Sequence, residues 1–319
     1  MFKYKYVFGP VLSRRLKLSL GLDIVPLKTC SFDCIYCECG RTTVLTTRRK
    51  EYIPVSEVLK EIDVYLSASP EVDFITFSGS GEPTLHLKIA EIIDFIKKKY
   101  PSYRLALLTN GSLLGEDKMA EELSGIDVVL PSLDAGTQKM FKIINRPLQG
   151  MNLKSIIEGL YYFRNHYSGQ IWLEVFIIPG LNDTEEELAG IKRALNYIKP
   201  DKIQLNTLDR PGIDASIAAA SKNQLKKIFH ILDYPGEIIA GGGNYSNKSK
   251  IEGEDVKYVI LQAISRRPST MDDLCCSLGL TKEVVEKYLK ELYEKKYVEI
   301  KKSTRGDFFT CIRDIKFVF

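Results

Sequence analysis

The chain has 319 residues, enough for a large core and two domains, and its formal net charge of +4 is too small to indicate a nucleic-acid partner by itself. Its 45% hydrophobic and 27% charged residues are ordinary for a soluble globular protein. No stretch of about 18 apolar residues occurs and the N-terminus has no apolar signal core, so we expect a cytoplasmic protein without membrane insertion. The odd number of cysteines, seven, disfavours a disulfide framework.

Six short apolar segments are predicted to be β-strands, and each is followed along the chain by a predicted helix. The strands are residues 18–26, 73–78, 104–109, 127–133, 171–178 and 202–206. The helices are residues 54–68, 85–99, 116–124, 151–167, 184–198 and 221–232. This alternation predicts a parallel sheet with helices outside it. About 200 residues are too few for the eight units of a complete barrel, so we expect an α/β fold with a partial (β/α)6 TIM-like barrel.

Turn-forming and polar residues gather where the predicted strands end. The stretches are 78–83, 109–111, 132–134, 179–183 and 206–211. Turn formation by Gly, Pro and Asn explains part of this pattern. The carboxyl ends of the strands form the active mouth of a barrel, so five successive strand ends of this kind favour one shared site.

The pattern changes at residues 240–250, a segment of Gly, Asn, Ser and Lys that is typical of a linker. Three helices and a hairpin with a glycine turn are predicted beyond it. The helices cover 255–264, the stretch from the capping box at 270–273 to Ser277, and the stretch that Thr281 caps. We therefore predict a barrel domain (1–239), a linker (240–250) and a winged helix-turn-helix domain (251–319).

Three cysteines lie within eight residues, as Cys30, Cys34 and Cys37 in the stretch CSFDCIYC. Three thiolates can hold three corners of a [4Fe–4S] cluster, whose full protein ligand set has four, and leave one iron open to a small molecule. Zinc is the first alternative, but structural zinc needs four ligands, usually in separated CxxC pairs. Buried structural cysteines are another alternative. Cys39 is either a bystander, which does not bind the metal centre, or a fourth ligand. As a ligand it would be sterically cramped, because only one residue separates it from Cys37.

The spacing CxxxCxxC, with the aromatic Tyr36 before the last cysteine, resembles the radical S-adenosylmethionine (SAM) superfamily. The segments SGSGEPTL (78–85), LLTNG, PSLDAG and FIIPGLND resemble the strand ends that cradle the cofactor in that superfamily. With NRP and QLNTLDRP, the combination resembles the branch that includes the wyosine-forming tRNA enzymes and uncharacterised archaeal and bacterial relatives. The resemblance covers about residues 7–235.

The resemblance implies a [4Fe–4S] cluster and S-adenosylmethionine as cofactors, with Cys30, Cys34 and Cys37 as cluster ligands. In that superfamily the open iron binds the amine and carboxylate of SAM. One electron, here from a donor of the ferredoxin or flavodoxin type, cleaves SAM to methionine and a 5′-deoxyadenosyl radical that takes a hydrogen atom from the substrate. The implied cofactor-binding residues are Tyr36, Gly79, Ser80, Gly81, Glu82, Thr109, Asn110, Ser132, Asp134, Glu174 and Asn206.

Two arginines are candidate substrate contacts. Arg146 and Arg210 each precede a proline at a strand end, where a guanidinium can bind a carboxylate or phosphate bidentately. A structural ion pair is the alternative for both. The three histidines, His86, His166 and His230, are expected on the surface or in helices.

The chain has neither the additional upstream cysteines nor the flavodoxin-like domain of the wyosine-forming enzymes, so the wyosine reaction itself is not expected. We expect a radical SAM enzyme that modifies RNA, such as tRNA. Modification of a peptide or protein, or of a small molecule, is the alternative. An iron–sulfur sensor that binds DNA is disfavoured, because a sensor does not need the strand-end motifs. The winged helix is expected to serve in packing or dimerisation, or to bind nucleic acid or peptide. Basic and acidic residues nearly balance over 251–319, whereas a dedicated nucleic-acid binder usually has a clearer basic excess.

Overall fold

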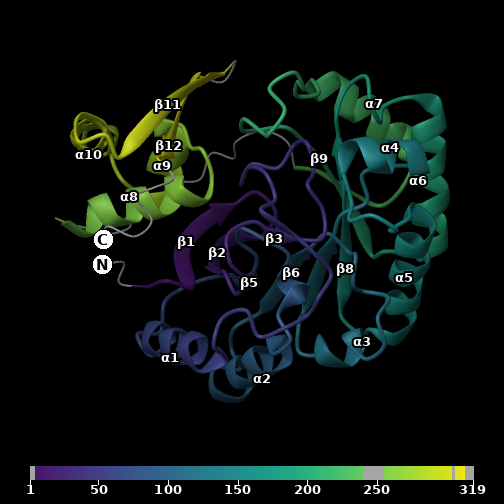
Figure 1. Ribbon diagram of the computed structural model, residues 1–319, viewed down its shortest axis with the longest axis horizontal. Helices are drawn as coiled ribbons and strands as arrows, with labels where there is room; N and C mark the ends of the chain where they lie inside the picture. The colour runs from purple at the N-terminus through teal and green to yellow at the C-terminus, as the bar shows by residue number, and fades with distance from the viewer. Residues whose placement is uncertain (1–3, 240–253, 304–305, 313–319) are drawn as a thin grey trace.

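The computed structural model describes residues 4–239, 254–303 and 306–312. In these residues the main sheet has eight strands in the order β1-β2-β5-β6-β7-β8-β9-β10 (Figure 1). β1 is antiparallel to β2, and the other neighbouring pairs are parallel. The strands are β1 (Val7–Ser13), β2 (Lys17–Leu22), β5 (Phe74–Phe77), β6 (Leu105–Thr109), β7 (Val128–Pro131), β8 (Gln170–Ile177), β9 (Lys202–Thr207) and β10 (Gly236–Ile238). The predicted α/β fold with a mostly parallel sheet is therefore confirmed.

The strands β2 and β5 to β9 lie in the six predicted segments, whereas the sequence pattern does not predict β1 and β10. β1 contains Gly9 and Pro10, which interrupt a strand pattern, and β10 is only three residues long. A separate parallel pair, β3 (Thr29–Cys30) and β4 (Val44–Leu45), lies on either side of the cysteine loop.

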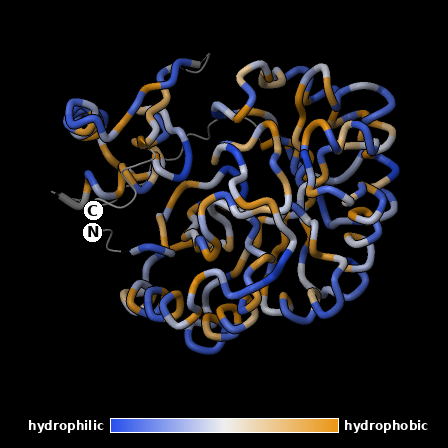
Figure 2. The backbone as a smooth tube through the Cα atoms, in the orientation of Figure 1, coloured by the Kyte–Doolittle hydropathy of each residue, from blue (hydrophilic) through white to orange (hydrophobic). Residues whose placement is uncertain are grey.

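Helices surround the outer side of the curved sheet (Figure 1). They are α1 (Val55–Leu66), α2 (Ile89–Lys99), α3 (Met119–Glu122), α4 (Gln138–Ile144), α5 (Leu153–His166), α6 (Glu185–Ile198) and α7 (Lys222–Leu232), with a 3₁₀ turn η1 (Pro83–Leu85). The sequence pattern does not predict α4, a helix of seven residues. In Figure 2 the outer turns of these helices are mainly hydrophilic, whereas the central strands carry many hydrophobic segments.

The main core lies between the sheet and these helices, as α2 illustrates. Its residues Ile89, Ile92, Ile93 and Ile96 recur at helical spacing and are at most 1% exposed. They join a cluster that includes strand residues such as Phe77. Burying a side chain of this kind contributes about 1.5–3 kcal/mol to stability.

The opposite side of the sheet is more polar. Side chains alternate along a strand, so residues between core positions face away from the helices. Thr76, Glu174 and Asn206 occupy such positions and are nevertheless buried, at 3%, 7% and 1% exposure. A small apolar cluster that includes Phe74 and Leu130 lies apart from the main core. The inner side of the sheet therefore offers polar groups at a distance from bulk water.

The described residues after 253 form three helices and an antiparallel hairpin with a core of their own. They are α8 (Glu254–Arg266), α9 (Met271–Leu278), α10 (Lys282–Glu294), β11 (Val298–Ser303) and β12 (Gly306–Cys311). The capping box that Thr270 and Asp273 form begins α9, and Gly279, at a left-handed φ of 64°, ends it. The predicted linker 240–250 lies outside the described residues. That residues 251–319 form a winged helix-turn-helix domain stays a prediction.

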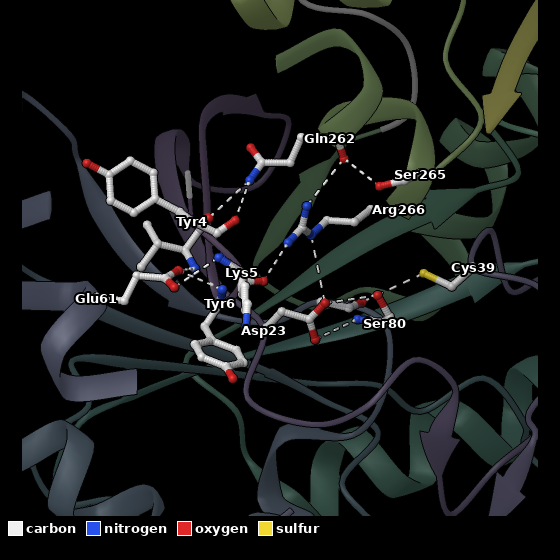
Figure 3. A network of polar contacts seen from close by, with 12 residues as sticks. Tyr4, Lys5, Tyr6, Asp23, Cys39, Glu61, Ser80, Gln262, Ser265 and Arg266 are labelled. Atoms are coloured by element: carbon white, nitrogen blue, oxygen red, sulfur yellow. Dashed lines mark hydrogen bonds and ion pairs between the residues drawn. The ribbon is translucent and has the colours of Figure 1, made fainter. Parts of the chain in front are cut away.

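Helix α8 contacts the N-terminal segment of the chain. The Tyr258 hydroxyl donates to the Tyr4 carbonyl at 3.0 Å, and Gln262 Nε2 donates to the Val7 carbonyl at 3.2 Å. Arg266 Nη2 donates to the Lys5 carbonyl at 3.4 Å (Figure 3). These contacts hold α8 beside the first strand of the sheet. Within the described residues, every helix is too short or too polar to cross a lipid bilayer.

His86 is fully buried, so the expectation of a surface or helical position is wrong for this histidine. Its Nδ1 accepts from the Lys88 backbone N–H at 3.2 Å, and its Nε2 lies 2.9 Å from the Ile53 carbonyl. Burial lowers the pKa of His86. The ring is therefore neutral where it connects η1 to the segment before α1.

We predict that His86 makes the protein less stable as the pH falls below about 6.5, the usual pKa of histidine. In that range the unfolded chain binds a proton that the folded chain resists, so the free energy of unfolding falls with the pH. His86→Gln removes the group that takes up this proton. The variant's free energy of unfolding, measured by urea unfolding at matched cluster content, should therefore change less between pH 7 and 5. His166→Gln, at the exposed end of α5, is the control. Equal slopes in wild type and His86→Gln would contradict the prediction.

Candidate active site

The loop that carries the three cysteines is held on two sides by backbone hydrogen bonds. On one side, the Lys28 N–H donates to the Ser80 carbonyl at 2.8 Å. On the other, the Ile35 N–H donates to the Ile144 carbonyl at 2.9 Å. The first anchor follows β5 and the second is the end of α4. The loop is thereby fixed at the carboxyl ends of the strands.

Each of the three cysteine sulfurs faces one N–H donor from outside the CSFDCIYC stretch. The pairs, as donor nitrogen and sulfur, are Lys28 Nζ and Cys37 at 3.0 Å, Asn110 Nδ2 and Cys30 at 3.4 Å, and Asn145 Nδ2 and Cys34 at 3.5 Å. Hydrogen bonds to the sulfurs are a property of iron–sulfur sites and tune their potentials. Sequence reasoning missed Lys28 and Asn145, and the NRP motif was the available signal for Asn145.

The thiols respond differently to their surroundings. Burial raises the pKa of the Cys30 thiol to about 12 and raises that of Cys34 well above its usual range. A hydrogen bond with Cys39, together with the Lys28 ammonium, lowers the pKa of Cys37. Buried thiols of this kind become thiolates when a metal centre takes their protons' place.

Three cysteine thiols on one loop are the donor set of a cluster with one open iron. Within the described part of the chain, no three Cys, His, Asp or Glu side chains gather closely enough for a single metal ion. A single ion such as zinc needs all its ligands in one coordination sphere, whereas a cubane presents a separate iron to each thiolate. Cys39 Sγ, the other thiol of this region, lies 3.7 Å from the Gly79 carbonyl.

The segment 79–82 approaches the cysteine loop through its backbone. The Glu82 N–H donates to the Thr29 carbonyl at 3.0 Å. A Cβ atom on Gly81 would lie only 2.3 Å from that carbonyl oxygen and 2.8 Å from Val25 Cγ2. Glycine at position 81 is therefore required for this close approach.

The Glu82 carboxylate connects β5 to β6. It is 2% exposed and accepts from the Thr109 hydroxyl and the Asn110 N–H, each at 2.7 Å, and from the Thr84 N–H at 3.1 Å. Burial raises the pKa of Glu82, although these donors oppose the shift. The carboxylate thus holds the turn that places Asn110 against Cys30.

Asp134 organises the strand ends on the other side of the loop. Its Oδ2 accepts from the Tyr36 hydroxyl at 2.6 Å and from Asn145 Nδ2 at 2.8 Å, and its Oδ1 accepts from the Phe176 N–H at 3.1 Å. Burial raises the pKa of Asp134 to about 6. The Tyr36 ring stacks on Phe176, with centroids 4.0 Å apart. Ser132 is bridged to Glu174 through the backbone.

Two predicted site residues lie deeper on the inner side of the sheet. Glu174 pairs with Arg15, an arginine that sequence reasoning missed. Asn206 is 1% exposed, and neither polar atom of its amide has a hydrogen-bond partner among the described residues. A buried amide without a partner is costly, so this side chain is suited to a bound ligand.

The two candidate substrate arginines differ. Arg146 is half-buried on a left-handed backbone, at a φ of 41°. Arg210 lies 3.4 Å from Glu38 of the cysteine loop and 3.6 Å from Asp273 of α9. Burial disfavours the charge of Arg210, yet Glu38 and Asp273 raise its pKa. Arg210 therefore connects the cysteine loop to α9.

Asp23, just after β2, makes a second connection to the C-terminal helices. Ser80 donates to its carboxylate through the hydroxyl at 2.9 Å and through the backbone N–H at 3.2 Å. Arg266 Nε of α8 lies 3.8 Å from the same carboxylate (Figure 3). The segment 79–82 is thus linked through Asp23 to α8.

Comparison with known proteins gives a family match and relatives along most of the chain. The family model described as "Radical SAM superfamily" matches residues 24–190. A UPF0026 protein of Helicobacter pylori is 32% identical over 305 residues, which are 95% of this chain and 96% of that protein. A protein named GTPase Obg of Brachyspira hyodysenteriae is 37% identical over 300 residues, which are 92% of this chain but only 43% of that protein. The chain thus spans less than half of that relative.

A radical SAM methyltransferase from Sphaerobacter thermophilus has a similar structure, with a TM-score of 0.54 and 17% identity. The match covers 70% of this chain and 67% of that chain. The likeness concerns the fold.

We predict that Gly81→Ala will reduce the iron content per chain after anaerobic reconstitution. The added methyl group must displace the Thr29 carbonyl, at a cost of about 1–3 kcal/mol, and Thr29 directly precedes Cys30. Gly150→Ala is a stringent control, because nothing lies within 4 Å of the added Cβ, while its left-handed φ of 93°, unlike the backbone at Gly81, is itself strained by an alanine. Equal iron content in the two variants would show that the close approach at residue 81 does not support the cluster site.

Proposed function

The chain belongs to the radical SAM superfamily, and on this premise we propose that it modifies RNA through a 5′-deoxyadenosyl radical. It is an enzyme whose cofactors are a [4Fe–4S] cluster and S-adenosylmethionine, and it needs an electron donor. Cluster and SAM together supply the radical, which takes a hydrogen atom from the substrate. The observation that carries the proposal is the set of three cysteines with an N–H donor at each sulfur.

We propose that Cys30, Cys34 and Cys37 hold the cluster and leave one iron for SAM. Lys28, Asn110 and Asn145 would then stabilise the negative charge on the sulfurs. Cys39 is proposed as a bystander, because its thiol contacts the Gly79 carbonyl and hydrogen-bonds with Cys37. A donor of the ferredoxin or flavodoxin type is the proposed source of the electron.

The proposed SAM contacts lie at the carboxyl ends of successive strands. Residues 79–82 are assigned to the methionine moiety, and Thr109 and Asn110 to its carboxylate or the ribose. The remaining assignments, for the nucleoside, are Tyr36, Ser132, Asp134, Glu174 and Asn206. The unpartnered amide of Asn206 supports its assignment most directly.

The RNA part of the proposal concerns residues 251–319, which we propose to be a winged helix-turn-helix domain that follows a linker, 240–250, and a barrel domain, 1–239. The three helices and the hairpin support this assignment. Exposed lysines lie along α10, just after its end and in the hairpin: Lys282, Lys287, Lys290, Lys295, Lys296, Lys301 and Lys302. Their charges suit the phosphate backbone of RNA.

Arg146 and Arg210 are proposed as substrate contacts. Arg146 stands directly before Pro147, which forms an isolated bridge with Phe32 of the cysteine loop. Arg210 would exchange the Asp273 carboxylate for a substrate anion, since that ion pair is long at 3.6 Å. The motifs that resemble the wyosine-forming branch support RNA as the substrate class.

We predict that the anaerobically reconstituted enzyme forms 5′-deoxyadenosine from SAM with dithionite as reductant. Cys34→Ala should form none above background, because two thiolates cannot retain the cluster in the same state. The assay is run with and without bulk tRNA, and the nucleosides of the tRNA are then examined by mass spectrometry. SAM cleavage with unaltered RNA would overturn the RNA assignment alone. No cleavage by a fully loaded wild type, with or without tRNA, would overturn the proposed chemistry for this substrate class.

A further inference from the structure

A cavity of about 320 Å³ lies between the inner side of the sheet, the β1–β2 hairpin and helices α8 and α9. Ser19, Thr76 and Ser78 line it from the sheet, and Ala263 and Cys276 line it from the C-terminal helices. Ser78 directly precedes the segment 79–82. The cavity therefore adjoins the proposed SAM site, and the C-terminal helices form one of its walls.

Arginines dominate the charged lining of this cavity. Among the described residues, five arginines and three aspartates line it: Arg14, Arg15, Arg210, Arg266, Arg267, Asp209, Asp272 and Asp273. Apolar side chains such as Phe8 and Leu108 complete the lining. Charged groups that converge in an enclosed space with some apolar lining are suited to fixing a small molecule or a single residue of a larger substrate.

Two of these arginines have their charge fully compensated by the protein. Burial disfavours the charge of Arg15, yet the adjacent Glu174 raises its pKa. Arg210 is compensated in the same way by Glu38 and Asp273. Arg15 is therefore satisfied without a ligand, whereas Arg210 Nε is buried without a hydrogen bond among the described residues.

Arg14 is compensated less well than Arg15, its neighbour in the chain. Its nearest described carboxylate is that of Asp209, 3.6 Å from Nη1, and this nitrogen is buried without a hydrogen bond among the described residues. Burial lowers the pKa of Arg14 because Asp209 does not offset the loss of water. A buried guanidinium N–H without an acceptor is costly, and a bound oxyanion would supply one.

Arg267 comes from the opposite wall. It is half-buried after the end of α8, where it lines the cavity. Arg266 differs, because it donates to the Gln262 and Lys5 carbonyls and lies over the Phe8 ring. Arg266 thus holds α8 in place, and Arg267 makes none of these contacts.

We propose that this cavity binds an oxyanion of the substrate, with Arg14 and Arg267 as its guanidinium ligands. The inference deepens the proposed function and rests on it: with RNA as substrate, the oxyanion is the phosphate of a single nucleotide placed beside the segment 79–82. Guanidinium groups bind phosphate and carboxylate bidentately, so both anions share the chemistry of the site. The volume admits one residue rather than a duplex, and the C-terminal helices act as a wall of the substrate site.

The test is calorimetric titration of the reconstituted enzyme, without oxygen, with uridine 5′-monophosphate and separately with glutarate. The variants are Arg14→Gln and Arg267→Gln, and Arg193→Gln on the exposed surface of α6 is the matched control. We expect the preferred probe to bind wild type and the control equally. Each cavity variant should bind it about 10- to 100-fold more weakly. Arg14→Lys, which keeps the charge, is the substitute if Arg14→Gln does not fold.

Preference for the nucleotide supports a phosphate ligand, and preference for glutarate supports the site with a carboxylate ligand instead. Failure of both probes to bind wild type, or equal binding by the cavity variants and the control, would overturn the proposal. Formation of 5′-deoxyadenosine is measured on the same wild-type preparation. Cleavage without anion binding would refute only the cavity, whereas anion binding without cleavage would refute only the proposed chemistry.

Discussion

The position of the candidate site depends on main-chain hydrogen bonds that hold the cysteine loop between two strand-end segments. On one side the backbone of residues 28–29 meets residues 80–82, and on the other Ile35 meets Ile144. Backbone groups make these contacts, and one side-chain donor at each sulfur adds to them. The approach at Gly81 is so close that one methyl group would disturb it. The cysteine loop and the segment 79–82 are thus fixed by the same contacts.

The C-terminal helices contact the candidate site as well as forming their own core. Two ion-paired routes join them to the barrel, one through Arg266 and Asp23 to Ser80, the other through Asp273 and Arg210 to the cysteine loop. Such buried pairs add little net stability, because desolvation offsets much of the attraction. They do fix orientation, and here they set the wall of a cavity that adjoins the cofactor segment. Substrate selection and radical chemistry would therefore share one enclosed space.

The sequence predicts what depends on local periodicity and on motifs. The six parallel strands, their helices and the elements after residue 253 follow from the spacing of apolar residues and from caps such as Thr270. The pattern misses β1, because Gly9 and Pro10 interrupt it, and α4, because it is short. Lys28, Asn145 and Arg15 were also missed as site residues. Their partners, Cys37, Cys34 and Glu174, are known only once distant segments meet in the fold, and a single sequence carries no signal of such pairs.

The central claim is that three cysteines hold a [4Fe–4S] cluster with one iron open to SAM. Electron paramagnetic resonance of the dithionite-reduced enzyme tests it most directly, with and without SAM, in wild type and in Cys39→Ala. We predict that SAM changes the spectrum of the reduced cluster in both proteins, because the open iron gains the amine and carboxylate of SAM as ligands. A spectrum that SAM leaves unchanged in both would mean that the fourth iron is closed, and would contradict the account.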